Sequence, residues 1–432
     1  MKGTFRSLDN HNYRVWAGGA VVSNVGTWMQ RIGQDWLVLT QLTYKNATAM
    51  GLVMALQFGP ALVLLPLTGY VADRMDRRKL LAITQGGMGL LALGLGILTI
   101  AGVVRLWEVD VFALLLGCVS AFDSPARQTF VSDLVGEEDL SNAVALNSTS
   151  FNAARMIGPA VAGVLIASVG TGWVFLINAA SFAAVLGSLG FMRTAELRSR
   201  GRPRGAPGSL VDGFRYVRSR PDLTAILLMT LLVGTFGLNF AIFISTMSVK
   251  VFHAGARQYG LLTSCMAVGS VIGALLSARR EKPRILFLLS GAAFFGIGLG
   301  LAAVMPNCWL FGAVLVLVGM SAQTFSTTAN GTLQTTTDPG MRGRVMAILM
   351  ATFMGTTPLG APIVGWVADR FGPRWALGLG AVAGIGAAGI GVRYLWKYRN
   401  LRLQRDSWHF HFSVDQPSEM DLHLLESKAE GA

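Results

Sequence analysis

Polar side chains interrupt the apolar segments of this sequence, and they are the residues that could carry out chemistry. Four of them fall on a narrow arc of one predicted helix and form a polar stripe. These are Asn24, Thr27, Arg31 and Asp35. An ionisable group inside lipid is costly and marks a functional site by default. Asp35 is the first candidate for a proton carrier, although Arg31, one turn away, could simply neutralise it.

Other apolar segments carry further groups of this kind. Asp123 and Arg127 stand four residues apart, which predicts an intrahelical ion pair, and Asp123 is the second candidate for proton coupling. Arg155 is either a buried arginine satisfied by its neighbours or a substrate ligand. Candidates to line a substrate cavity, besides those of the stripe, are Arg155, Asn239, Gln323 and Asn330.

Composition indicates which elements hold these groups. Hydrophobic residues make up 52% of the 432 residues and charged residues 14%, so lipid is the expected solvent. A membrane helix needs about 20 apolar residues. The apolar runs predict an all-α membrane protein with twelve spans, at Val15–Gln41, Ala47–Ala72, Leu80–Val104, Trp107–Phe130, Ser141–Ser168, Trp173–Met192, Leu223–Val249, Gln258–Ala278, Ile285–Met305, Trp309–Leu333, Val345–Ala368 and Pro373–Trp396.

The positive charges predict the orientation of these spans. With the N-terminus inside, only six of the 36 Lys and Arg residues fall in external loops and two within spans. This asymmetry follows the positive-inside rule and places both termini in the cytoplasm, as expected of a multi-pass inner-membrane protein. Because the charges lie between apolar spans, the net charge of +13 indicates topology and not nucleic-acid binding.

A basic break divides the chain into two pseudo-symmetric halves. We predict a six-helix half over 1–192, a cytoplasmic linker with an amphipathic helix over 193–221, a second six-helix half over 222–397, and a polar cytoplasmic tail over 398–432. Gly158 and Gly163 find counterparts in Gly360 and Gly365. Such a parallel repeat places a substrate site near the middle of the membrane.

The loop after the second span carries a recognisable motif. The run from Gly69 to Lys79 resembles the cytoplasmic signature of the major facilitator superfamily, although Asp76 replaces its second glycine. The resemblance implies the major facilitator fold and a latch that closes the cytoplasmic side, formed by Gly69, Asp73, Arg74, Arg77, Arg78 and Arg127. Gly69 is expected to let the second helix pack closely. A similar string around Asp369 falls outside by span parity, so a one-sided latch is expected.

The fifth span resembles a second signature of that superfamily. Gly158, Pro159 and Gly163 match the end of the antiporter motif of its exporters, with Ala162 in place of one glycine. Proline and small residues would bend the helix and bring it close to the partner half. With further likeness at Gly26–Gln30 and Pro125–Gln128, the sequence resembles the branch that contains the enterobactin exporter and macrolide and drug efflux proteins.

These observations favour a secondary active transporter over an enzyme. The sequence has no phosphate-binding Gly-x-x-x-x-Gly-Lys string and no histidine inside a span, and its three cysteines have unrelated spacings, so neither a cofactor nor a metal is expected. We predict a monomeric proton-coupled antiporter that exports a siderophore, drug or secondary metabolite across the bilayer by alternating access. An importer of the same fold and a non-transporting sensor or receptor remain the alternatives.

The charge distribution generates a prediction about topology. Cysteines introduced at Lys45 and Arg257 should react with an impermeant maleimide in whole cells, because both positions are expected outside. Cysteines at Arg204 and Arg342 should react only after the membrane is permeabilised. Labelling of Arg204→Cys in intact cells would contradict the predicted orientation.

Overall fold

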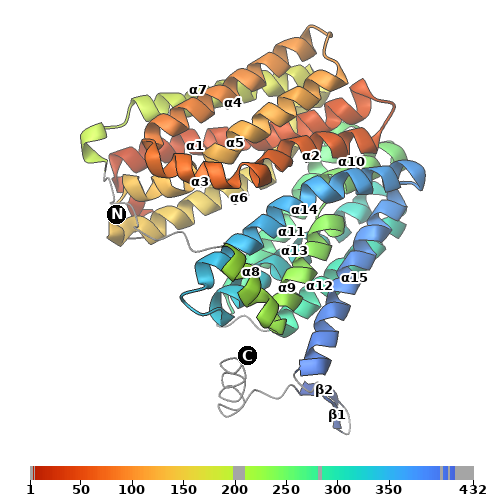
Figure 1. The fold of residues 1–432 in the computed structure, drawn as a ribbon. Helices are drawn as coiled ribbons and strands as arrows, with labels where there is room; N and C mark the ends of the chain where they lie inside the picture. Colours follow the sequence, from red (N-terminus) through yellow and green to blue (C-terminus); the bar gives the residue numbers. More distant parts are fainter. Residues whose placement is uncertain are drawn as a thin grey trace.

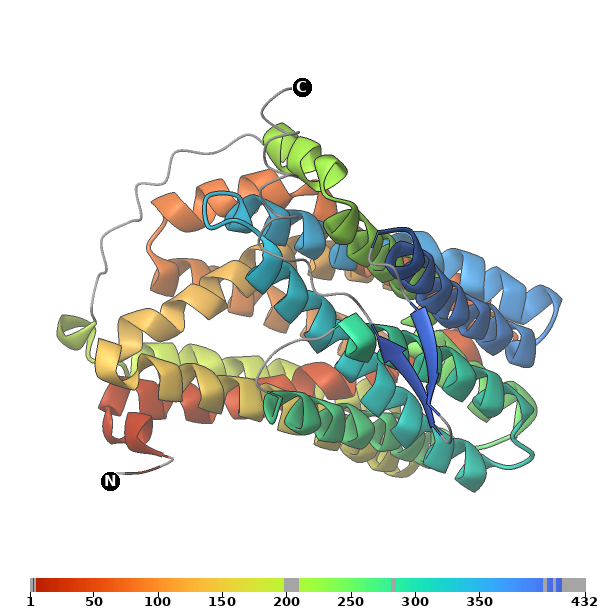
Figure 2. The ribbon, with the colours of Figure 1, turned by 90° about the horizontal axis from the view of Figure 1, so that it is seen from below.

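The computed structural model describes residue 3 and residues 5–197, 210–280, 285–398, 402–406 and 409–413. Almost all of them are helical, which confirms the predicted all-α class. The helices form two bundles, one on each side of the molecule in Figures 1 and 2. We call them the first bundle (α1–α7) and the second bundle (α9–α15).

The first bundle follows the apolar runs closely. Asparagine side chains cap its early helices: Asn10 accepts from the Tyr13 amide and Asn46 from the Ala49 amide. Proline and a local break separate two helices that the sequence analysis treated as one span. The elements are η1 (Arg6–Asp9), α1 (His11–Trp36), η2 (Leu37–Leu42), α2 (Ala47–Val63), α3 (Leu65–Arg74), α4 (Arg77–Ile100), α5 (Leu106–Leu134), α6 (Glu137–Val169) and α7 (Thr171–Gly190).

The second bundle begins after a short connecting helix and contains one helix of irregular winding. Its first span is broken into four pieces, two of them π-helical. The elements are η3 (Thr194–Glu196), α8 (Leu210–Ser219), α9 (Pro221–Leu232), η4 (Val233–Gly237), α10 (Phe240–Thr246), η5 (Met247–Val251), α11 (Ala256–Ala278), α12 (Ile285–Val304), α13 (Cys308–Thr336), α14 (Arg342–Arg370) and α15 (Pro373–Tyr398).

Nine helical segments of the described residues are long and apolar enough to cross a membrane, counting Pro221–Val251 as one. The predicted spans outside this set are those of α1 and α5, which carry polar side chains named above, and that of the interrupted pair α2 and α3. The multi-pass character is therefore clear, while the count of twelve spans stays a prediction.

A small hairpin near the C-terminus was not predicted. Strands β1 (Arg402–Asp406) and β2 (His409–Ser413) pair antiparallel, with Asp406 opposite His409. The alternation His-Phe-His-Phe in β2 has the period of a strand. The sequence analysis had assigned this stretch to the polar tail over 398–432 and predicted no strand there.

The amphipathic linker helix was predicted and is present as α8. Phe214 is exposed, whereas Val217 is buried against the second bundle. Tyr216 donates a hydrogen bond to Asp338 at 2.8 Å and ties α8 to the connection between α13 and α14. Partial burial raises the pKa of the Tyr216 hydroxyl.

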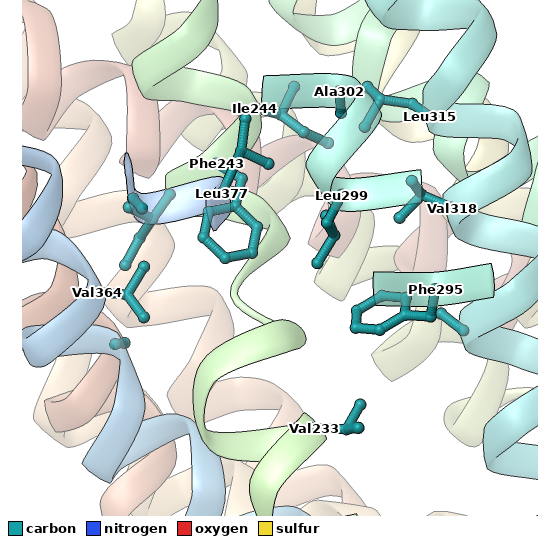
Figure 3. Packing of buried hydrophobic residues seen from close by; sticks show 14 of the residues in the cluster. Val233, Phe243, Ile244, Phe295, Leu299, Ala302, Leu315, Val318, Val364 and Leu377 are labelled. Atoms are coloured by element: carbon teal, nitrogen blue, oxygen red, sulfur yellow. The ribbon is translucent and has the colours of Figure 1, made fainter. Parts of the chain in front are cut away.

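The core of the second bundle is a continuous set of aliphatic and aromatic side chains. Phe243, Phe295 and Leu299 are fully buried and come from α10 and α12, as Figure 3 shows. Each such side chain excludes lipid and water from the bundle interior. The same buried cluster continues into the first bundle, where it includes Met50 and Phe175.

The two bundles meet through two helix pairs, α2 with α14 and α6 with α11 (Figure 1). A Cβ atom at Gly51 would collide with the backbone carbonyl of Ala361, and one at Gly260 with that of Pro159. These contacts lie at the end of the molecule where α2 and α11 begin. We call this end, which is opposite the N-terminus, the closed end.

Candidate functional site

The stripe on α1 reaches the second bundle at the closed end. The Tyr259 hydroxyl of α11 donates a hydrogen bond to Asp35 Oδ2 at 3.0 Å. The Trp36 ring stacks on the Tyr259 ring with centroids 6.1 Å apart. Asp35 therefore joins the two bundles, a role that the sequence analysis did not foresee because the partner lies 224 residues away.

Arg31 lies on the same helix, half-buried among aromatic rings. Its guanidinium carbon is 4.6 Å from the centroid of the Trp28 ring and 5.5 Å from that of Phe58. Its Nε atom is buried and has no hydrogen-bond partner among the described residues. Aromatic faces stabilise a cation without consuming its N–H donors, so those donors stay available.

Arg155 is the second cation of this region. Within the described part of the chain, its buried Nε and Nη2 atoms have no hydrogen-bond partner. It stands one turn before Gly158 on α6, where a Cβ would lie 2.7 Å from Cβ of Trp28. The edge of Phe151 also meets Trp28, with centroids 5.8 Å apart. Trp28 thus joins the two helices that carry Arg31 and Arg155.

Asp123 is the centre of a satisfied polar network and not an isolated acid. Arg127 Nε donates to Asp123 Oδ2 at 3.1 Å, which confirms the predicted ion pair. Thr84 and Gln85 donate to Asp123 Oδ1 at 2.8 and 2.7 Å. Arg127 also reaches Asn24 Oδ1 at 3.4 Å. Three donors thus bind the Asp123 carboxylate within one bundle, so this site is better suited to stability than to proton transfer.

Polar side chains of α13 line an open cavity. Its volume is about 350 Å³, and its wall comprises Gln323, Ser326, Thr327, Asn330, Gly331 and Phe353. Gln323 and Asn330 were predicted for the substrate cavity, and they do lie on a cavity wall. Thr27 is half-buried on α1.

Asn239 lies where the first span of the second bundle is broken, between η4 and α10. Its Nδ2 atom donates to the Thr235 carbonyl at 2.7 Å, while its Oδ1 is buried and unpartnered among the described residues. The sequence analysis named Asn239 but did not predict the break. Gly234 and Gly237, the second and the last residue of η4, were the available signal.

The predicted cytoplasmic latch is only partly visible. Arg77 pairs with Asp133 at 2.6 Å, and Arg78 Nε donates to the Leu189 carbonyl at 2.9 Å. Arg74 donates to the Tyr70 hydroxyl and lies over its ring. The Asp73 side chain is outside the described residues.

The expected close packing at Gly69 is wrong for this structure. Among the described residues, a Cβ atom there would meet nothing within 4 Å. The glycine that does bring the second span close to its neighbour is Gly51, on the other side of the helix break.

The one-sided cytoplasmic latch stays a prediction, but the string around Asp369 has contacts of its own at the closed end. Asp369, in the string that was set aside, accepts hydrogen bonds from the Ala47 and Thr48 amides at 2.9 and 2.7 Å. It also pairs with Lys250 at 2.6 Å. These contacts bind α14 to the start of α2, in the other bundle. Span parity correctly placed the string around Asp369 at the opposite end of the molecule from the run Gly69–Lys79. It could not show which residues of the other bundle this string contacts.

The antiporter-like residues of α6 form one of the two contacts between bundles. A Cβ at Gly163 would lie 2.7 Å from the Ala256 carbonyl oxygen of α11, and Gly260 of α11 lies against Pro159. Ser264 donates to the Met156 carbonyl at 2.7 Å, a bond that also crosses between bundles. The expected close approach is therefore present, while its role in export stays a prediction.

The fold defines the class of protein. The structure is similar to that of a bacterial homologue of the human lysosomal transporter Spinster, inward-facing and unoccupied, with a TM-score of 0.69 and 14% identity over 91% of this chain and 96% of that chain. It is similar to a D-xylose–proton symporter with a TM-score of 0.69 and 14% identity over 91% and 98%. The chain has the fold of major facilitator transporters.

The sequence places the chain within that class. The model of a family described as transmembrane secretion effectors matches residues 2–414, and the chain belongs to this family of the major facilitator superfamily. A staphyloferrin A transporter of Staphylococcus aureus is 29% identical over 81% of this chain and 87% of its own length. An enterobactin exporter of Shigella flexneri is 28% identical over 86% and 88%. The protein is a multi-pass membrane transporter and not an enzyme.

The Asp123 network generates a stability prediction. Asp123→Ala leaves the guanidinium of Arg127 without its counter-charge and should cost about 3–5 kcal/mol of unfolding free energy. Thermal unfolding of the purified protein in detergent measures the loss. In the control, Asp123→Ala/Arg127→Ala, both charges are absent and the loss should fall well below the sum of the single losses. Additive losses would contradict the network.

Proposed function

We propose that this protein is a proton-coupled antiporter of the inner membrane, with both termini cytoplasmic, that exports a small anionic molecule of the siderophore, drug or secondary-metabolite class. The observation that carries this proposal is a pair of cations, Arg31 and Arg155, whose buried N–H donors have no partner among the described residues. They lie inside a transporter whose relatives handle siderophores. The transported molecule and protons are then its only obligatory partners, and one chain suffices.

Alternating access is supported by the asymmetry of the interface. The bundles touch closely at the closed end, where α2 meets α14 and α6 meets α11. Polar side chains of α13 line a cavity of about 350 Å³. In this proposal the structure is an inward-facing state, and the predicted boundaries at 1–192 and 222–397 delimit the two bodies that rock against each other. The latch around Asp73 and Gly69 would form in the opposite state.

The proposed substrate class follows from charge. A buried cation whose N–H groups lack partners is unfavourable by itself and gains stability when an anion binds. The cavity residues Gln323 and Asn330 offer amide donors and acceptors for the polar parts of the same molecule. A cationic substrate would meet repulsion from Arg31 and Arg155.

Proton coupling is assigned to Asp35 because its carboxylate lies at the contact between bundles. Its Oδ2 atom accepts the hydrogen bond of Tyr259 across the interface at 3.0 Å. Opening the closed end breaks this bond and exposes the carboxylate to the outer solution, where it can bind a proton. Asp123 is the next candidate if Asp35 is not the carrier.

The test of the function is a flux measurement with the purified protein in proteoliposomes. An imposed pH gradient should drive an anionic siderophore out of the compartment that corresponds to the cytoplasm, and substrate counterflow should occur without a gradient. Flux only in the opposite direction would favour the importer. Neither flux nor counterflow with any of a panel of siderophores and drugs would favour a sensor or receptor.

Arg155 gives a prediction on substrate charge. Arg155→Lys keeps the charge but loses the planar fork that binds carboxylates in two places, a loss of about 1.5–3 kcal/mol or roughly 10- to 100-fold in apparent KM for anions. Cationic substrates of the same transporter should change little. Arg14→Lys, at an exposed position, is the control. Equal losses for anions and cations would indicate that Arg155 is purely structural.

Asp35 gives the prediction on coupling. Asp35→Asn keeps the size of the side chain and removes the group that binds and releases the proton. Gradient-driven transport in proteoliposomes should vanish while counterflow, which moves no net proton, continues. Asp76→Asn, which retains a cap on α4, should behave as the parent protein. If Asp35→Asn still accumulates substrate against a pH gradient, the proton travels by another group.

A further inference from the structure

We propose that Asp369 is the gate residue of the closed end, which holds the transporter shut toward the outside by binding the start of α2 and Lys250 together. The proposal rests on the alternating-access function proposed above. It assigns a conformational role to a string that resembles the cytoplasmic signature but stands at the opposite end of the molecule.

The carboxylate of Asp369 accepts four hydrogen bonds. Its Oδ1 atom accepts from the Ala47 amide at 2.9 Å and from Lys250 Nζ at 2.6 Å. Its Oδ2 atom accepts from the Thr48 amide and from Thr48 Oγ1, both at 2.7 Å. The Asp369 side chain is 25% exposed, so water reaches the group only in part.

The start of α2 is incomplete without this residue. The first amides of a helix have no partner within it, and an N-cap side chain satisfies only one or two of them. Asn46 Oδ1 accepts a hydrogen bond from the Ala49 amide at 2.9 Å. The amides of Ala47 and Thr48 are bound by Asp369, from the other bundle. The negative carboxylate also interacts favourably with the positive end of the helix dipole.

Lys250 completes the group. It stands at the end of the broken first span of the second bundle, in η5, and its side chain is 20% exposed. Because Lys250 and Asp369 belong to the same bundle, their pairing alone does not join the bundles. It sets the carboxylate in position and compensates its charge while the carboxylate binds α2.

The contact exists only while α2 and α14 touch. One turn before Asp369, a Cβ at Gly365 would collide with the Ala47 carbonyl, and Gly51 lies equally close to Ala361. Hydrogen bonds are short-ranged, so any separation of these backbones breaks the three bonds from α2 to Asp369 together. These hydrogen bonds therefore stabilise the closed state and not the open state.

This role differs from that of an ordinary helix cap. Glu108 accepts from the Arg105 amide at 2.9 Å at the start of α5, within one bundle, and its contact survives any movement of the bundles. Loss of such a cap lowers the stability of every state. Loss of the Asp369 contact shifts the balance between states, which is a separate observable.

The experiment measures access to the closed end and needs neither substrate nor gradient. Met50 is 1% exposed and its sulfur lies 3.3 Å from Ser245 Oγ of the other bundle. In a background without Cys118, Cys265 and Cys308, Met50→Cys should react slowly with an impermeant maleimide in whole cells. Adding Asp369→Ala should raise the labelling rate at least five-fold, with Asp369→Asn intermediate and Lys250→Met a smaller increase.

The matched control is Glu108→Ala, which removes a capping carboxylate from the same end and should leave the labelling rate unchanged. Parental labelling in a folded Asp369→Ala variant, judged by size-exclusion elution, would overturn the proposal. An increase seen only in inverted vesicles would overturn the placement of the gate on the outer side. If Asp369→Ala raises the labelling rate but the parent protein transports none of the substrates tested, the gate is supported and the proposed function is contradicted.

Asp369→Asn and Lys250→Met cover the case in which Asp369→Ala does not fold, and a cross-linking variant tests whether the contact must open during transport. The pair Thr48→Cys/Asp369→Cys places two thiols where the present side chains touch. Oxidation should cross-link α2 to α14, stop counterflow and prevent Met50→Cys labelling, and reduction should restore both. Counterflow that continues in the fully cross-linked protein would overturn the proposal, because a gate must open during transport.

Discussion

The absence of water from the hydrocarbon core is the constraint on which the rest of this structure depends. Each span satisfies its backbone hydrogen bonds within itself, so the chain is helical. Side-chain polar groups face the same demand and gather between helices. Asp123 draws donors from α4 and α5, and Asn178 of α7 donates to Gln30 of α1. The polar residues that would serve transport are thereby concentrated in the bundle interiors and at the contact between bundles.

The interface between the bundles depends on close backbone contacts and on a few polar side chains. Glycines bring the backbones of α2 and α14, and of α6 and α11, into direct contact at the closed end. Hydrogen bonds to two carboxylates add to these contacts: Tyr259 donates to Asp35, while Ala47 and Thr48 donate to Asp369. Both carboxylates therefore bind more partners in the closed state than in an open one.

The local features of the site were predictable and its long-range partners were not. The spacing of Asp123 and Arg127 predicted an ion pair because residues four apart face each other on any helix. Gln323 and Asn330 were named as polar residues of one helix and do line a cavity, while their contact with a substrate stays a prediction. Tyr259 was missed as the partner of Asp35, since no local pattern connects them. The sequence analysis expected close helix packing at Gly69, and the structure shows it at Gly51 instead. A glycine in a sequence indicates that close packing is possible, but it does not identify the partner helix.

The sequence by itself determined the solvent, the helical class and the family, because hydropathy, charge asymmetry and motifs are properties of short segments. Only the tertiary structure decided which segments touch. Asp369 lies 322 residues from Ala47, and a string that parity seemed to exclude from the latch joins the two bundles. The physical reason is that a hydrogen bond forms only between atoms a few ångströms apart in space. Once helices pack side by side, the number of residues between two positions no longer determines that distance.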